Sequence, residues 1–205
     1  MAPPPEMAQA LAQLAVAIRQ MIEISDAELA AFAEFCSLQQ LPRKAYLLQP
    51  GQGCNDIYFV CSGLLRIINT DREGVDHTAH FALENQFITD YASYLQHRPS
   101  RQGMQAIEDT TLVVMPRQAI DWGYQHLNQG QKLGRLIAEY YFIYLDDRIN
   151  NMYWKEPAER YNDITEVFPN IHNRVPQHMI ASYLGITPVH LSRLKKAERQ
   201  KQAKV

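Results

Sequence analysis

Residues Gln177–Lys196 read QHMIASYLGITPVHLSRLKK, and their small and apolar members stand at the spacing of a helix-turn-helix. Ala181 is small enough for a second helix to cross close above the first, and Gly185 stands where the first helix ends in a left-handed turn. Thr187 can cap the second helix, and Pro188 fits its first position, where an N–H has no helical partner. Apolar contacts between the helices are expected from Ile180, Leu184, Ile186, Leu191 and Leu194. The sequence therefore predicts two short helices, with one face of the second exposed.

The C-terminal segment is basic, although the whole chain has a net charge of −2 at pH 7. Residues 171–205 hold one acidic side chain, Glu198, against the basic residues Arg174, Arg193, Lys195, Lys196, Arg199, Lys201 and Lys204. Lys and Arg that neutralise phosphates supply most of the sequence-independent affinity of proteins for DNA. The placement favours DNA binding over an ordinary helical hairpin in a core. For Ala197–Val205, a solvated tail and a phosphate contact both stay open.

The exposed face of the second helix supplies the candidate DNA contacts. At base edges we expect Val189, His190, Ser192 and Arg193, and at phosphates Gln177, Thr187, Lys195, Lys196 and Arg199. The guanidinium fork of Arg193 matches the O6 and N7 acceptors of guanine. Val189 can contact only apolar groups such as the methyl group of thymine.

The composition is that of a soluble globular protein, with 205 residues of which 46% are hydrophobic and 20% charged. We expect neither a signal peptide nor a membrane span. Three cysteines without CxxC spacing, Cys36, Cys54 and Cys61, argue against a disulfide framework and a zinc finger, and favour the cytoplasm. His77 and His80 lack a nearby third ligand, so no metal site is expected there.

The order of predicted elements indicates an α+β chain. An amphipathic helix is predicted over Pro5–Ile24, and a capping box at Ser25–Glu28 opens a second helix that runs to about Cys36. Short strands and turns over Leu41–Met115 indicate a small β-barrel or roll. A long helix follows over Asn128–Trp154, and Ala158–Val167 begins a helical C-terminal domain. The predicted boundaries are 1–127, 128–157 and 158–205.

The long helix carries an apolar stripe at alternating spacings of four and three residues, formed by Leu133, Ile137, Tyr140 and Tyr144. Such a stripe needs a partner. The partner is either the β-roll of the same chain or the same helix of a second chain, and the helix alone favours neither. A homodimer through these four residues is our working prediction.

Taken in this order, the elements resemble the cyclic-AMP receptor protein/FNR (Crp/Fnr) family of bacterial transcription regulators. The resemblance rests on PGQGCNDIYFVCSGLLRI (50–67), AIEDTTLVVMP (106–116), the long helix and YLGITPVHLSRLKK (183–196). It implies an N-terminal jelly roll like that of cyclic-nucleotide-binding proteins, a dimerisation helix, and a winged-helix-like domain whose second motif helix, Pro188–Ala197, enters the major groove. It further implies double-stranded DNA, a second copy of the chain and RNA polymerase as partners, with no enzymatic activity.

The effector site of that family is altered in this sequence. Nucleotide-binding members use a Gly-Glu pair and an Arg-Ser or Arg-Thr pair, which align here with Thr89-Asp90 and with the reversed pair Ser100-Arg101. Thr89 crowds the close backbone approach, and Arg101 is expected to point away from the pocket because neighbouring strand residues face opposite sides. We therefore expect no cyclic AMP and no other cofactor; iron–sulfur and haem signatures are also weak.

Two other functions are considered. The chain could be a ligand-sensing or protein-interaction module that has lost DNA binding, or an enzyme that uses Asp90 and His97. No nucleophile motif or phosphate-binding glycine loop supports the enzyme. Pro169–Val175 is short for the β-hairpin wing that many members place before the helix-turn-helix, so the wing is expected to be reduced or absent.

Overall fold

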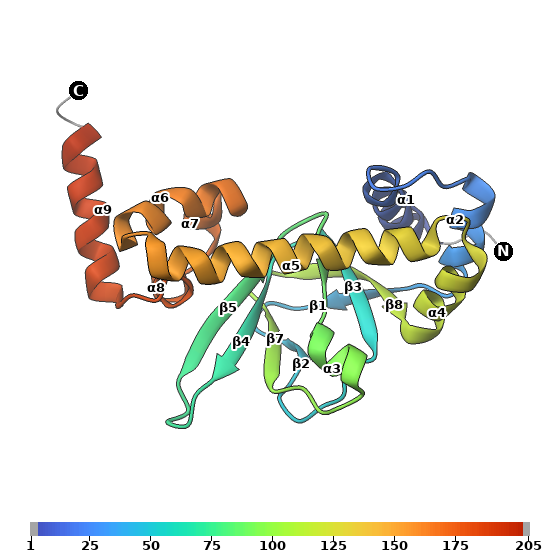
Figure 1. Ribbon diagram of the computed structural model, residues 1–205, viewed down its shortest axis with the longest axis horizontal. Helices are drawn as coiled ribbons and strands as arrows, with labels where there is room; N and C mark the ends of the chain where they lie inside the picture. Colours follow the sequence, from blue (N-terminus) through green and yellow to red (C-terminus); the bar gives the residue numbers. More distant parts are fainter. Residues whose placement is uncertain (1–3, 203–205) are drawn as a thin grey trace. The chain divides into compact units, whose positions relative to one another are not determined.

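The computed structural model describes residues 4–202, apart from the side chains of residues 198, 199, 201 and 202 (Figure 1). Its helices are α1 (Pro5–Arg19), α2 (Asp26–Ala33), α3 (Tyr91–Gln96), α4 (Arg117–His126), α5 (Gly130–Trp154), α6 (Pro157–Val167), α7 (Ile171–Arg174), α8 (Gln177–Leu184) and α9 (Pro188–Gln202). Its strands are β1 (Ser37–Leu41), β2 (Tyr46–Leu48), β3 (Asp56–Ser62), β4 (Leu65–Thr70), β5 (Asp76–Ala82), β6 (Phe87–Ile88), β7 (Gln102–Ala106) and β8 (Thr110–Pro116).

The strands form two four-stranded sheets in the orders β1-β8-β3-β6 and β2-β7-β4-β5. In the first sheet β8 lies antiparallel between β1 and β3, with Val113 opposite both Leu38 and Phe59. The side chains of Phe59 and Val113 are fully buried. The structure confirms the predicted α+β chain with an N-terminal β-roll.

The first two helices form where the sequence predicts them, although α1 ends at Arg19 and α2 at Ala33, before the expected ends at Ile24 and Cys36. Ala10, Leu14 and Ile18 recur on one face of α1 and are buried against the roll. The capping box of α2 is complete, because Glu28 N donates to Ser25 Oγ at 3.2 Å and Ser25 N donates to Glu28 Oε2 at 3.0 Å. Helix α4 was not predicted; it separates the last strand from the long helix.

The long helix α5 buries the start of its predicted stripe in its own chain. Leu133 and Ile137 pack against the core that the roll shares with α1 and α4, together with Leu136 and Tyr141. The hydroxyl of Tyr141 donates a hydrogen bond to the carbonyl of Phe87. For this part of the stripe, the intramolecular alternative is the one that the structure adopts.

Two compact units divide the described residues. The roll unit contains the chain up to Ile67 together with Phe81–Phe142, and the C-terminal unit contains Ile68–His80 together with the chain from Ile143 onward. The division therefore crosses α5 at its middle, whereas the sequence analysis placed boundaries at the two ends of this helix. It also assigns the hairpin between β4 and β5 to the C-terminal unit, which no local sequence signal predicts.

The helix-turn-helix has the predicted local structure. Gly185 ends α8 with a positive φ of 69°, and a Cβ added there would meet Met152 Cε at 2.4 Å. Thr187 Oγ1 accepts a hydrogen bond from His190 N at 3.2 Å, so it caps α9. The contacts between the two helices bury Ala181 and Leu191 almost completely.

The segment before the helix-turn-helix is helical. Asn170 adopts a positive φ of 62°, and Ile171–Arg174 form the single turn of α7. In the described chain, α7 occupies the place where a winged-helix domain would have its β-hairpin. Among the described helices, none is long and apolar enough to cross a membrane.

We predict that Gly63→Ala destabilises the roll far more than Gly51→Ala. Both glycines have φ near +90°, so both variants carry the left-handed strain of about 1–2 kcal/mol. A Cβ at Gly63 would also lie 2.5 Å from the carbonyl oxygen of Asp109, whereas one at Gly51 meets nothing within 4 Å. The additional clash should cost about 1–3 kcal/mol more in the free energy of unfolding. Equal losses in denaturant titrations of the two variants would contradict this reading.

Candidate nucleic-acid interface

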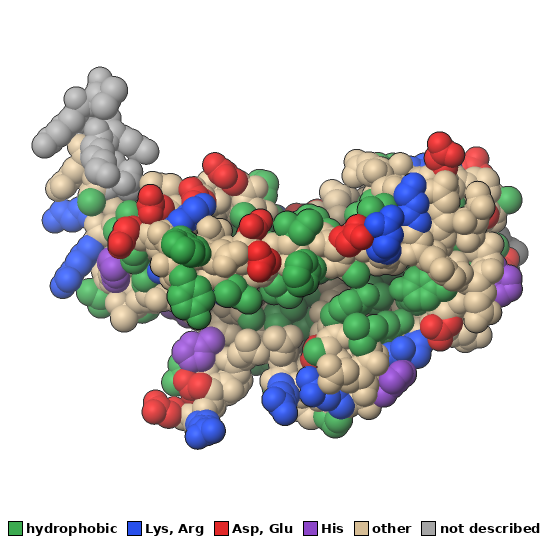
Figure 2. Space-filling view, in the orientation of Figure 1, with side chains coloured by type: hydrophobic (Ala, Val, Ile, Leu, Met, Phe, Trp, Pro, Cys, Tyr) green, Lys and Arg blue, Asp and Glu red, His purple; other side chains and the backbone are tan. Residues whose placement is uncertain are grey.

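Helix α9 presents an exposed polar and basic face. Leu191 is 1% exposed and holds the helix to α8, whereas Val189 is 62% exposed. The side chains of His190, Ser192, Arg193 and Lys196 are also exposed. Figure 2 shows Lys and Arg side chains gathered along this helix. The predicted base-reading residues thus share a face that is exposed among the described residues of the C-terminal unit.

A hollow of about 520 Å³ lies between the start of α8 and α9. It is lined by Gln177, Pro188, Ser192, Lys195 and Lys196. The N-cap of α8, Pro176, makes no side-chain hydrogen bond to the first turn, and the positive end of the helix dipole lies there. Two lysine side chains beside a helix N-terminus without a side-chain cap suit an anion such as a phosphate.

The positive charge of this region affects the pKa of a neighbouring histidine, His172. Burial lowers the pKa of His172, and the nearby Lys195 ammonium lowers it further because a second positive charge is disfavoured there. Arg199, the last predicted phosphate contact, has its side chain outside the described residues. Thr187 is exposed beside the hollow, although its hydroxyl oxygen already caps α9.

The four predicted effector residues are brought together only in part. Asp90 is 5% exposed and caps α3, with Oδ1 accepting from Ser93 N at 3.1 Å and Oδ2 accepting from Ser100 Oγ at 2.5 Å. Ser100 is buried, whereas Arg101 is exposed. Both oxygens of the Asp90 carboxylate are therefore engaged by the chain itself, and no guanidinium joins them.

Ser93 completes this buried network, and the sequence analysis did not identify it. Its Oγ accepts from Cys54 N at 3.1 Å and donates to the carbonyl of Arg98 at 2.6 Å. Thr89 Oγ1 donates to the carbonyl of Asp56 at 2.9 Å and lies 3.2 Å from Cys54 Sγ. The available signal was the Asp-x-x-Ser spacing of Asp90 and Ser93, which is typical of a capped helix.

The structure separates the residues considered for an enzyme, and likewise His77 from His80. Asp90 and His97 stand at opposite ends of α3. His77 bonds Asp71 at 2.8 Å, whereas the buried His80 bonds the hydroxyl of Tyr144 at 2.8 Å. Among the described residues, no three His, Cys, Asp or Glu side chains gather as metal ligands would.

The predicted dimer residues differ in their surroundings. Leu133 and Ile137 pack on the roll unit, Tyr144 is hydrogen-bonded within the C-terminal unit, and Tyr140 is 55% exposed. The ring of Tyr140 also lies 5.6 Å from that of Tyr141, so all four have contacts inside the chain, the alternative that the sequence had left open. That they lie in a dimer interface stays a prediction.

A second apolar stripe on α5 is exposed, and the sequence analysis missed it. Its members follow at spacings of three, four and three residues: Phe142 (72% exposed), Leu145 (50%), Ile149 (56%) and Met152 (40%). Figure 2 shows hydrophobic side chains along α5 in this view. The spacing was visible in the sequence, but two apolar stripes on one helix cannot be ranked without knowing which face the chain covers.

Comparison with known proteins agrees with this architecture. Residues 38–126 match the cyclic nucleotide-binding domain family. FixK2 from Bradyrhizobium japonicum superposes with a TM-score of 0.69 at 15% identity, over 82% of this chain and 86% of that one. A putative Crp/Fnr-family transcriptional regulator from Eubacterium rectale gives 0.66 at 16% identity, over 87% and 85%. A CooA variant from Carboxydothermus hydrogenoformans gives 0.63 at 17% identity, over 88% of each chain. No curated protein sequence matches the chain.

Residues 38–126 are thus similar to a cyclic nucleotide-binding domain, and the helix-turn-helix α8–α9 follows later in the chain. Over most of its length it has the fold of the Crp/Fnr transcription regulators.

Proposed function

We propose that the protein is a Crp/Fnr-type transcription regulator that binds double-stranded DNA. The observation that carries the proposal is the exposed face of α9 beside the basic hollow at the start of α8. Val189, His190, Ser192 and Arg193 would contact base edges in the major groove. Lys195, Lys196 and the N-terminus of α8 would contact phosphates, which set affinity and register. Such a regulator acts in the cytoplasm, and RNA polymerase is a further partner.

The DNA-binding form is proposed to be a homodimer through α5. The exposed stripe Phe142, Leu145, Ile149 and Met152 has the spacing of a coiled-coil seam, and two copies related by a twofold axis can cover it. A dimer with a twofold axis matches an operator whose two half-sites are related by a twofold axis. The proposed seam is centred on this stripe, because the predicted residues Leu133, Ile137 and Tyr144 already pack in part within their own chain.

The roll is proposed not to use cyclic AMP as its effector. The carboxylate of Asp90 is already bonded to Ser93 and Ser100, and the exposed Arg101 supplies no charge to a phosphate in the pocket. A cyclic nucleotide would have to break these internal hydrogen bonds without gaining a bidentate guanidinium contact.

Arg193→Ala should weaken binding to the best operator by about 1–3 kcal/mol and relax the preference at one base per half-site. Selection from a random DNA pool, followed by titration, measures both effects. Lys196→Ala is the matched control on the same helix: as a phosphate contact, it should weaken all sequences alike and flatten the salt dependence. An unchanged base preference in Arg193→Ala would contradict the assignment.

Phe142→Asp combined with Ile149→Asp should convert the dimer to a monomer, because two copies would bury four carboxylates in the seam. Sedimentation at micromolar concentration gives the state, and operator affinity should fall in parallel. Val16→Asp is the control, since Val16 is 60% exposed on α1, away from the stripe. A wild-type protein that sediments as a monomer would refute the dimer.

Millimolar cyclic AMP should leave both the melting temperature and the operator affinity unchanged. A ligand at a hundred times its dissociation constant would add about 2.7 kcal/mol to the free energy of unfolding and raise the melting temperature measurably. A shift in both quantities would mean that Arg101 reaches the pocket after a change of register.

A further inference from the structure

A chain of polar side chains, buried at His80 and Tyr183 and half-buried at Tyr144, joins three elements of the C-terminal unit. His80 is on β5, and its Nδ1 lies 2.8 Å from the hydroxyl of Tyr144 on α5. That hydroxyl lies 3.1 Å from the hydroxyl of Tyr183 on α8. Burial, and then the charge of Arg148, lower the pKa of His80 to about 3, so its ring is neutral at physiological pH. The Tyr144 hydroxyl is thus the shared middle of the chain.

Aromatic and cationic contacts surround this hydrogen-bond chain. The ring of Phe168, which follows α6, lies 5.7 Å from that of His80 and 5.4 Å from that of Tyr183. The Arg148 guanidinium lies 3.9 Å above the Tyr183 ring and donates to the Tyr183 carbonyl at 3.2 Å. Tyr144 and Arg148 are one helical turn apart on α5, so one face of this helix holds the first helix of the motif at two points.

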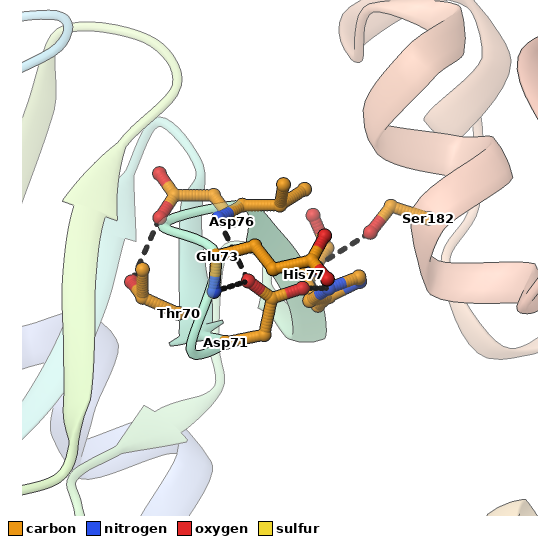
Figure 3. Close-up of polar contacts among 8 residues, drawn as sticks. Thr70, Asp71, Glu73, Asp76, His77 and Ser182 are labelled. Carbon is orange, nitrogen blue, oxygen red and sulfur yellow. Dashed lines mark hydrogen bonds and ion pairs between the residues drawn. The ribbon is translucent and has the colours of Figure 1, made fainter.

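A second connection joins β5 directly to α8. Thr78 N donates to Ser182 Oγ at 2.9 Å, and Figure 3 shows Ser182 reaching from its helix toward the hairpin. The hairpin turn is itself ordered by Asp71, which accepts hydrogen bonds from the backbone of Glu73 and Val75 and bonds His77 (Figure 3). The strand is therefore presented to α8 by a turn with a defined conformation.

We propose that Tyr144 is the positioning residue that fixes the helix-turn-helix on the dimerisation helix, with His80 and Ser182 extending this control to strand β5. This inference rests on the proposed function. The same half of α5 carries Leu145 and Ile149 of the exposed stripe, so a rigid link from α5 to α8 sets how far apart two reading helices stand in the dimer. Strand β5 belongs to the sheet β2-β7-β4-β5, and these contacts join it to the unit that contains the helix-turn-helix.

The consequence is a strict spacing between the two half-sites of the operator. Moving one half-site by a single base pair displaces it by about 3.4 Å and turns it around the duplex axis. A helix-turn-helix held by directional hydrogen bonds has to strain or lose contacts to follow that move. A helix-turn-helix that is released from α5 can follow the shifted half-site with little loss of affinity. It is, however, oriented less precisely on the best site.

The test compares Tyr144→Phe with Tyr153→Phe. Tyr144→Phe removes the shared hydroxyl and keeps the ring that packs on His80 and Phe168. Tyr153 is on the same helix and 83% exposed, so its hydroxyl is the matched control. The full-length proteins are titrated with the operator obtained by selection, and with duplexes whose half-sites stand one base pair closer or farther apart.

In Tyr144→Phe, the ratio of affinities between the best and the altered spacings should fall about tenfold, as expected for losing one or two neutral hydrogen bonds. Affinity for random duplex DNA should not change, because the phosphate-contacting side chains are intact. Tyr153→Phe should behave as wild type. A purely structural role for Tyr144 would lower the melting temperature and all affinities together, without changing their ratio.

Ser182→Ala is the second variant and decides the case if Tyr144→Phe fails to fold. It removes the acceptor for Thr78 N and should relax the spacing in the same direction, by a smaller factor. If the folded variants discriminate between half-site spacings as strongly as the wild type does, the positioning role of Tyr144 is wrong. The proposed DNA-binding function is not affected by that result. A wild-type protein that enriches no DNA sequence refutes the proposed function, and the inference with it.

Discussion

Helix α5 has apolar side chains on two faces, and the structure depends on which of them the chain covers. Leu133 and Ile137 are covered by the roll unit, and Tyr144 is engaged within the C-terminal unit. The neighbouring face, from Phe142 to Met152, is largely exposed, although Met152 also lies beside Gly185. A second copy related by a twofold axis would supply an identical stripe and cover this one, as the proposed homodimer requires.

In the roll, Asp90, which aligns with a residue of the effector site, is hydrogen-bonded within the chain. The buried carboxylate of Asp90 caps α3 and accepts a hydrogen bond from Ser100. Both of its oxygens therefore have partners without a bound ligand. The guanidinium that could recruit a phosphate belongs to Arg101, which is exposed. A buried carboxylate without partners would be costly, and these internal hydrogen bonds remove that cost. Recognition of a polar effector at this point would have to begin by breaking them.

The C-terminal unit combines an exposed basic face with a buried polar anchor. Ala181 and Leu191 are buried in the unit where α8 packs on α9, and the hydrophobic effect that stabilises such packing is non-directional. The hydrogen bonds of Tyr144 and the guanidinium of Arg148 have preferred directions, so they can specify one orientation of α8 on α5. Such a directional anchor suits the proposed binding of DNA, in which the two half-sites stand at a fixed spacing.

Much of the local structure was determined by the sequence alone. The capping box at Ser25, the left-handed turn at Gly185 and the cap at Thr187 formed as predicted, because each depends on residues a few positions apart. The basic charge of the last segment and the β-roll were equally readable. Tertiary structure decided the covered face of α5, the engagement of Asp90, and the assignment of β5 to the C-terminal unit. His80 and Tyr144 are 64 positions apart and Tyr144 and Tyr183 are 39 apart, so no local pattern records that these side chains meet.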